Sequence, residues 1–572
     1  MNTTSVVPVM DKLIIYQIFT RLFGNQNTTN RFNGSIEENG SGKFNDINDD
    51  ALRAIKQFGA SHVWYTGVIE HATQTDYSAY GILPDDPSVV KGRAGSPYAI
   101  KDYYDVDPDL AVNVPNRMAE FEALVERTHV HGLKVLIDFV PNHVARQYKS
   151  DAKPANVVDL GANDDTSVRF SIENNFYYLP GETFVSPEKS QEATTNALHE
   201  FPAKVTGSGS ITASPDINDW YETIKLNYGF NIFEGGQQFE PVPATWKQML
   251  DILLFWANKG VDGFRCDMAH YVPIPFWKWA ISRVKQQFPR ILFIAEIYDP
   301  NLYRPFIFDG GFDYLYDKVG LYDTLRELME GHGSCYNITR VWQQESGEYA
   351  QHMLRFLENH DEQRIASRFF ANDLWSAVPA MTLSATMHTG PYMLYFGQET
   401  GVRPEEAEGF SGDDGRTTIF DYWGISDWQG WINKGRYDGL GLSDEQQRLR
   451  SFYQQLNYLV NGSDAIQNGY FYDLQYANDN GQSPGYDAQR LYSYLRHTDR
   501  QKLLIVCNFS INTTYETTIR IPGHAFEVMG LSPSRTFTFT DIFLTNSEID
   551  AVGTMGVPVV LPPRSVRVLE IK

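Results

Sequence analysis

Two stretches, GFRCD at Gly263 to Asp267 and LFIAEIY at Leu292 to Tyr298, decide the fold class of this sequence. In each, a run of apolar residues gives way abruptly to a carboxylate. Two further stretches do the same, DFVPNHV at Asp138 to Val144 and FLENHDE at Phe356 to Glu362. Buried strands of a parallel sheet read as near-continuous apolar runs. Polar residues at their C-terminal ends are typical of the face where parallel α/β barrels build active sites.

Strand-type and helix-type segments alternate around these stretches. Strand-type runs are expected at residues 13–19, 62–65, 134–139, 263–266, 291–295, 312–314, 354–357 and 393–396, and helical patterns cover 49–58, 116–129, 245–259 and 275–287. This alternation predicts a parallel sheet with crossover helices. Eight strands is the number that closes a (β/α)8 TIM barrel.

Two segments interrupt the alternation. Residues 145–215 are rich in Ser, Thr, Asn, Gly and Pro, and an unstructured loop of this length is uncommon in a compact domain, so an inserted subdomain is expected after the third strand. Short alternating runs such as KLLIVCNFS predict a C-terminal antiparallel β-sandwich at residues 462–572. The barrel would comprise residues 11–144 and 216–460.

The charge balance excludes some partners. The chain has 572 residues and a formal net charge of −23, which disfavours nucleic acid and anionic membranes as partners and fits a neutral substrate. No run of about eighteen apolar residues is present, so no membrane span is expected. The sequence does not specify an oligomeric state.

Two observations bear on the compartment. Three cysteines, Cys266, Cys335 and Cys507, are an odd number that argues against a disulfide framework. The stretch MNTTSVVPVMDKLIIYQIFTRLF lacks the basic and apolar regions of a signal peptide. We therefore expect a cytoplasmic protein, with a periplasmic or secreted one as the alternative if a signal peptide was removed.

The carboxylates have the pattern that glycoside hydrolysis requires, which is a nucleophile and an acid about 5 Å apart for retention of configuration. Neighbouring strand ends are separated by that distance, so Asp267 and Glu296 could meet it. Arg265 lies two residues before Asp267, points to the same side and would stabilise its ionised form. The apolar residues before Glu296 favour its protonated form.

In their order, the four stretches resemble the signature regions of the α-amylase family of glycoside hydrolases (glycoside hydrolase family 13). The likeness rests on an Asp two residues after an Arg, an isolated Glu and a terminal His-Asp pair. It extends to IIYQIFTRLF, which is similar to the first barrel strand, SPYAIKDYYDVDP, which is similar to the loop before the third, and MLYFGQE, which is similar to the eighth.

The resemblance implies a role for each matching residue. Asp267 would be the catalytic nucleophile, Glu296 the general acid/base, and Asp361 the residue that binds the hydroxyls of the distorted sugar. The implied substrate-binding residues are Arg265, His143, His360 and Tyr98, the last stacking on the sugar ring.

No cofactor is required for this chemistry, but the resemblance implies a possible Ca²⁺ bound with the help of Asn142. In many calcium-dependent members, Lys and His stand three and four residues after the nucleophile, where this chain has His270 and Tyr271. Acidic residues of the insert such as Asp159 and Asp164 have no calcium-loop spacing. The departure leaves both the calcium and the choice between endo- and exo-action open.

The expected function is that of an α-amylase-type retaining glycosidase that cleaves α-1,4-glucosidic bonds in maltooligosaccharides or starch-type α-glucans through a covalent glycosyl-enzyme. One alternative is an α-glucan transglycosylase, or a trehalose- or sucrose-active member, because water and sugar hydroxyls compete for the same intermediate. A second is a non-catalytic carbohydrate-binding protein on this fold. The three carboxylates standing together with Arg265 favour an enzyme.

Overall fold

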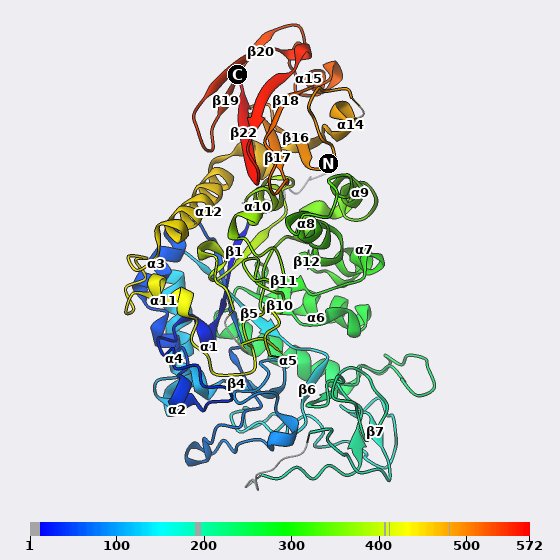
Figure 1. Cartoon of the computed structure of the whole chain (residues 1–572). Coiled ribbons are helices and arrows are strands. Elements are labelled where there is room, and N and C mark those ends of the chain that lie inside the picture. The colour runs from blue at the N-terminus through cyan, green and yellow to red at the C-terminus, as the bar shows by residue number, and fades with distance from the viewer. Residues whose placement is uncertain (1–11, 189–195, 405–407, 411, 480) are drawn as a thin grey trace.

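The computed structural model describes residues 12–188, 196–404, 408–410, 412–479 and 481–572. The predicted domain limit at residue 11 and residues 189–195 of the predicted insert lie outside the described residues. In Figure 1 the segment inserted after β5 lies at the bottom, the barrel in the middle and the C-terminal sheets at the top.

The central sheet contains eight parallel strands in the order β13-β12-β11-β10-β5-β2-β1-β14. They are β1 (Ile14–Phe19), β2 (His62–Thr66), β5 (Lys134–Phe139), β10 (Gly263–Cys266), β11 (Leu292–Ala295), β12 (Tyr314–Tyr316), β13 (Met353–Leu354) and β14 (Tyr392–Tyr395). A parallel bridge between Arg355 and Tyr392 closes the sheet. The prediction of a (β/α)8 barrel is therefore confirmed.

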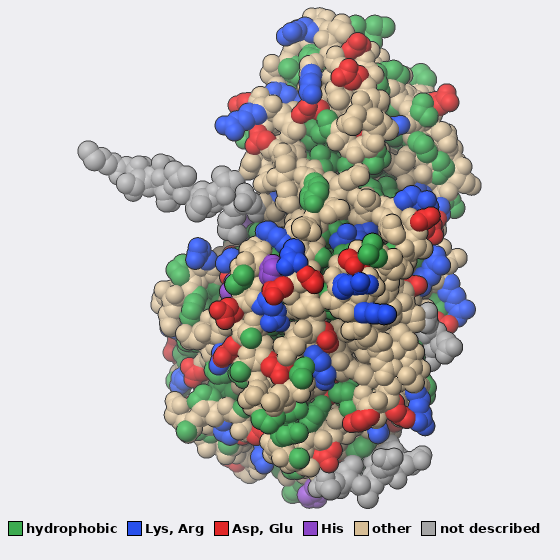
Figure 2. Space-filling view, turned by 90° about the vertical axis from the view of Figure 1, so that its left-hand side faces the viewer, with side chains coloured by type: hydrophobic (Ala, Val, Ile, Leu, Met, Phe, Trp, Pro, Cys, Tyr) green, Lys and Arg blue, Asp and Glu red, His purple; other side chains and the backbone are tan. Residues whose placement is uncertain are grey.

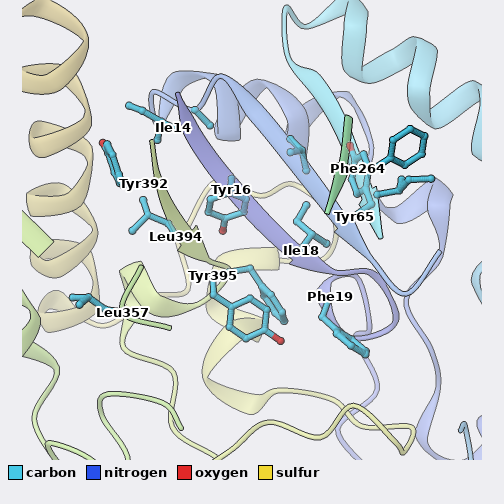
Figure 3. Packing of buried hydrophobic residues seen from close by; sticks show 14 of the residues in the cluster. Ile14, Tyr16, Ile18, Phe19, Tyr65, Phe264, Leu357, Tyr392, Leu394 and Tyr395 are labelled. Carbon is cyan, nitrogen blue, oxygen red and sulfur yellow. The ribbon is translucent and has the colours of Figure 1, made fainter. Parts of the chain in front are cut away.

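The barrel strands bury both faces. One set of alternating residues, including Ile15, Leu136 and Ile294, forms a cluster that is separate from the main core and fills the barrel. The other set, including Ile14 and Leu394, belongs to the main core and packs against the surrounding helices. Figure 3 shows these two residues on the neighbouring strands β1 and β14. This double burial explains why the strands read as continuous apolar runs.

Helices surround the barrel and pack apolar side chains against its strands. They include α3 (Asp49–Gln57), α4 (Arg117–Val130), α5 (Ala244–Asn258), α6 (Ile274–Gln287), α8 (Asp323–Met329), α9 (Tyr336–Gln344), α10 (Ala377–Thr386) and α12 (Asp444–Gly462). Helix α5 buries Met249, Leu253 and Trp256 at spacings of three or four residues. The four predicted helices correspond to α3, α4, α5 and α6.

The segment after β5 is held by short antiparallel pairs. Strand β6 (His143–Ala145) pairs with β9 (Thr223–Lys225), and β7 (Tyr178–Leu179) pairs with β8 (Ala203–Lys204). The β6–β9 pair brings Lys225 opposite His143. Pairing within this segment therefore continues beyond residue 215, and the exact domain limits stay predictions.

The C-terminal part is a sandwich of two antiparallel sheets, as predicted. One has the order β15-β16-β17-β22-β19-β20 and the other is β18-β21. The strands are β15 (Tyr470–Asp473), β16 (Leu491–His497), β17 (Lys502–Asn508), β18 (Tyr515–Ile519), β19 (Thr536–Asp541), β20 (Glu548–Val552), β21 (Val557–Leu561) and β22 (Ser565–Ile571). Leu495, Val506, Ile519 and Val559 share a core cluster between the sheets.

The surface is mixed in charge on the face that Figure 2 presents, where acidic and basic side chains are interspersed. The excess of acidic residues is therefore not gathered into a single acidic patch on that face. Among the described helices, none has the length and apolar character to cross a membrane.

Candidate active site

The two central carboxylates directly follow neighbouring barrel strands. Cys266 and Ala295 are register partners at the ends of β10 and β11, and Asp267 and Glu296 come next. The backbone N–H of Glu296 still donates to the Cys266 carbonyl at 3.1 Å, so the ladder continues to the carboxylates. Their main chains are thus about 4.8 Å apart, the spacing of adjacent strands.

Arg265 joins the carboxylates from inside the barrel. Its Nη1 donates to Asp267 Oδ1 at 2.9 Å. Its Nη2 lies 2.9 Å from Glu296 Oε2, an ion-pair contact without hydrogen-bond alignment. Nε donates to the Tyr316 hydroxyl at 3.2 Å, and Nη1 lies 3.5 Å from Asp138 Oδ1. The side chain is 1% exposed, so its charge acts with little screening by water.

Asp267 is not simply kept ionised by its arginine. Burial raises its pKa well above the ordinary range, the charge of Glu296 raises it further, and Arg265 acts in the opposite direction. The expected contact with Arg265 exists and has the expected sign, but burial and the second carboxylate outweigh it. We infer that the negative charge of Glu296 opposes the ionisation of Asp267.

Glu296 has a different donor on each oxygen. The backbone N–H of Met268 donates to Oε2 at 2.8 Å, and the Tyr298 hydroxyl donates to Oε1. Met268 adopts a left-handed conformation (φ 42°), which is uncommon for a residue with a branched or long side chain. Neither Met268 nor Tyr298 was predicted as a site residue. Tyr298 was open to prediction, because it lies two residues after Glu296 in the continuation of the same strand.

Asp361 is held by His360 at the other side of the site. His360 Nε2 lies 3.0 Å from Asp361 Oδ2, and the Gln17 amide Nε2 lies 2.8 Å from His360 Nδ1. Because the amide nitrogen can only donate, His360 accepts at Nδ1 and carries its proton on Nε2. Burial would raise the pKa of Asp361, but His360, Arg265 and Arg416 together lower it. The lowered pKa favours the anionic form of Asp361.

Tyr98 links the two sides. Its hydroxyl hydrogen-bonds to His360 Nε2 and donates to Asp138 Oδ1 at 3.3 Å, and its ring stacks on His360 with centroids 5.4 Å apart. Asp138 also accepts from the Trp64 indole at 3.1 Å. Tyr98 is thus fixed at the wall of the site by polar contacts at one end of its ring.

A cavity of about 400 Å³ brings the predicted residues together. It is lined by Tyr98, His143, Asp267, Glu296 and Asp361. Aromatic side chains from other segments complete it: Trp220, Tyr298, Phe410 and Phe420. Aromatic faces and converging polar groups are the usual lining of a site for a sugar-sized ligand. Arg265 and His360 lie beneath this lining and contact its carboxylates.

Asn142 does not offer a free oxygen to a calcium ion. Its Oδ1 accepts a hydrogen bond from Lys225 Nζ at 2.6 Å, and its Nδ2 donates to the Gly207 carbonyl at 2.8 Å. The ammonium also lies 5.2 Å from the centroid of the Tyr271 ring. A fixed cation therefore stands at the oxygen that the metal would need, and the expected calcium does not fit this position.

Another group of acids could hold a metal ion. Carboxylate oxygens of Glu70, Asp102, Asp105 and Asp151 lie within 4.8 Å of one another. Asp102 already accepts from Ser150 Oγ at 2.6 Å, and Asp105 pairs with Arg117. This group is separate from the residues that line the cavity between Tyr98 and Glu296.

Comparisons with known proteins point to a single family. Residues 17–293 match the family model of the α-amylase catalytic domain. The chain is 24% identical over 513 residues to α-amylase MalA of Haloarcula japonica, which covers 89% of this chain but only 57% of that protein. It is 24% identical over 406 residues to a cyclomaltodextrin glucanotransferase of a Bacillus strain, covering 68% of this chain and 49% of the relative. The fold is similar to that of the noncanonic maltogenic α-amylase AmyB of Thermotoga neapolitana, with a TM-score of 0.63, 20% identity and 98% coverage of both chains.

Proposed function

Because this chain belongs, through the catalytic domain at residues 17–293, to the α-amylase family of glycoside hydrolases, we propose that it cleaves α-1,4-glucosidic bonds of maltooligosaccharides or starch-type α-glucans with retention of configuration. The observation that carries this proposal is the contact of one guanidinium, that of Arg265, with both Asp267 and Glu296. It supports a carboxyl pair at the short separation of retaining enzymes.

In the first step, Asp267 attacks the anomeric carbon while Glu296 protonates the leaving oxygen. Arg265 holds Oδ1 of Asp267, so Oδ2 is the oxygen that attacks. Oε2 of Glu296 faces the Met268 N–H and Arg265, so the transferable proton belongs on Oε1. The Tyr298 hydroxyl at Oε1 can donate to the carboxylate and accept from the acid, and so supports both forms.

In the second step, Glu296 takes a proton from water, and the water attacks the glycosyl-enzyme ester at the anomeric carbon. The C–O bond to Asp267 breaks and the carboxylate is regenerated. Asp361 and His143 bind sugar hydroxyls at this site, His360 holds Asp361 from beneath the lining, and Tyr98 stacks on the sugar ring. The neutral aromatic lining of Trp220, Phe410 and Phe420 supports an uncharged carbohydrate as the substrate.

Transfer of the glycosyl group to a sugar acceptor is the second candidate. The similarity to a protein named cyclomaltodextrin glucanotransferase favours it, as does Tyr271, which is 44% exposed and has its ring 6.1 Å from that of Trp220. Exposed aromatic residues beside the cavity are suitable for an acceptor sugar.

Timed product analysis on maltoheptaose, combined with NMR of the first products, tests the proposal. Hydrolysis with retention yields shorter oligosaccharides whose new reducing ends are initially α-anomers, and transfer yields products longer than the substrate. Asp267→Asn abolishes both. Initial β-anomers, or undiminished activity of Asp267→Asn, would exclude the mechanism.

A further inference from the structure

We propose that Lys225 is a positioning residue for substrate binding, because its ammonium fixes the Asn142 amide, and this amide fixes the proton of His143 on Nε2. The inference rests on the proposed function, in which His143 donates to a sugar hydroxyl. It assigns to a lysine of the inserted segment the place that a metal ion would otherwise take.

The first link joins Lys225 to Asn142. Lys225 ends β9 and is the register partner of His143 on β6, so the antiparallel pair delivers its side chain beside the barrel. Nζ donates to Asn142 Oδ1 at 2.6 Å. Among the described residues, no carboxylate forms an ion pair with Lys225. The Lys225 ammonium is therefore stabilised by a hydrogen bond to Asn142 and by a cation–π contact with the Tyr271 ring.

The second link is the direction of the Asn142 amide. An ammonium has donors only, so the amide must turn its oxygen toward Lys225 and its nitrogen away. The two amide hydrogens then point to the Gly207 carbonyl, at 2.8 Å, and to His143 Nδ1, at 3.1 Å. With the amide turned the other way, Nδ2 would face the ammonium, donor against donor, and Oδ1 would face the Gly207 carbonyl.

The third link is the tautomer of His143. Since Nδ1 accepts from Asn142, the proton of the neutral ring lies on Nε2. His143 lines the cavity with Asp267 and Asp361, where an N–H donor is useful to a sugar hydroxyl.

The same arrangement occurs at the second histidine of the site. The Gln17 amide nitrogen lies 2.8 Å from His360 Nδ1 and 2.9 Å from Thr66 Oγ1. Both histidines therefore receive a side-chain amide at Nδ1 and keep the proton on Nε2. The two differ in what orients the amide, a threonine hydroxyl at His360 and the Lys225 ammonium at His143.

The test compares Lys225→Met, Lys225→Arg and, as the control, Lys149→Met, which removes an exposed lysine of the same segment. In Lys225→Met the Asn142 amide is free to turn. We expect KM for maltoheptaose to rise about tenfold, with a smaller change in kcat. The loss of one hydrogen bond to the substrate weakens binding by about a factor of ten. Lys225→Arg restores most of the affinity, and Lys149→Met leaves KM unchanged. An unchanged KM in a folded, active Lys225→Met would overturn the proposal.

The tautomer itself can be observed by NMR of ¹⁵N-histidine-labelled enzyme, with His143→Gln identifying the signal. The wild-type ring is expected to be protonated on Nε2, and a ring protonated on Nδ1 would refute the inference even if Lys225→Met fails to fold. Wild-type activity on maltoheptaose separates the two levels of inference. If the wild type is inactive on every α-glucan, the proposed function fails, whereas an active wild type with an Nδ1–H tautomer refutes only the role of Lys225.

Discussion

The Tyr298 hydroxyl donates a hydrogen bond to Oε1 of Glu296, the carboxylate oxygen that neither Arg265 nor the backbone of Met268 contacts. This places a group that can both donate and accept at the oxygen on which the proposed mechanism locates the catalytic proton. The proposed acid/base therefore has groups that can only donate at Oε2, and at Oε1 a hydroxyl that can either donate or accept a hydrogen bond.

Tyr298→Phe removes the hydroxyl that contacts Glu296 while keeping the aromatic ring in the cavity wall. We expect kcat for maltooligosaccharides to fall about tenfold, because one hydrogen bond to the proton-transferring oxygen is lost. Maltosyl fluoride, whose leaving group needs no proton, should show a much smaller loss. Steady-state kinetics on both substrates provide the check, and equal losses on the two would contradict this role.

The pH dependence of nucleophilic attack by Asp267 should depend on the charge of Glu296. In the proposed mechanism Asp267 attacks only when ionised. Its pKa is raised by burial and by the neighbouring carboxylate, so activity should appear only above the ordinary titration range of an aspartate. Glu296→Gln removes that negative charge and lowers the pKa of Asp267. With maltosyl fluoride, the acid limb of kcat/KM for formation of the glycosyl-enzyme should therefore move to lower pH.

The exposed Glu173 supplies the control for this shift, since it lies in the inserted segment and Glu173→Gln removes a carboxylate far from Asp267 in sequence. The acid limb should not move in this variant. A limb that stays in place in Glu296→Gln would show that the two carboxylates do not interact as the geometry indicates.

Arg265 compensates three buried carboxylates, so its removal should affect both stability and activity. Arg265→Met leaves Asp138, Asp267 and Glu296 without their shared cation, and loss of one partner of a buried ion pair costs about 3–5 kcal/mol of unfolding free energy. Arg265→Lys keeps the charge but cannot span two carboxylates, and should be intermediate. Urea unfolding and kcat/KM are the measurements, and a fully active Arg265→Met would be incompatible with the proposed site.

Chelation should leave substrate affinity unchanged. The Lys225 ammonium donates to Asn142 Oδ1, the oxygen that a calcium ion would need. The orientation of Asn142 beside the cavity therefore does not depend on calcium. We expect the same KM for maltoheptaose with EDTA and with added Ca²⁺. A KM that rises with EDTA and recovers specifically with Ca²⁺ would mean that Asn142 binds the metal after all.

The barrel could be predicted because its signals are local. Each strand is a short apolar run, and a polar residue near its C-terminal end, such as Asp138 or Glu296, continues the row of side chains that faces the barrel interior. The observed strands begin and end within a few residues of the predicted ones. The neighbouring positions of Asp267 and Glu296 could be predicted because adjacent strand order follows from sequence order in such a barrel, whereas their catalytic roles stay predictions.

What the sequence could not supply depends on side chains that meet across long separations. Lys225 reaches Asn142 across 83 residues, and the pattern of neither segment indicates that contact. The conformation of Met268 (φ 42°) is a property of one turn and has no signature in periodicity. Burial raises the pKa of Asp267 and so opposes the effect of Arg265, which lowers it. The extent of this burial depends on the surrounding packing, which residue types alone do not define.

The most direct test of the central claim is peptide mapping by mass spectrometry of Glu296→Gln after reaction with maltosyl fluoride. Fluoride leaves without an acid, and the missing base slows hydrolysis, so the intermediate should accumulate. We predict a single maltosyl adduct on the peptide that contains Asp267, absent in the variant that also carries Asp267→Asn. Rapid formation of free maltose without any adduct, or an adduct on another residue such as Asp361, would contradict the account.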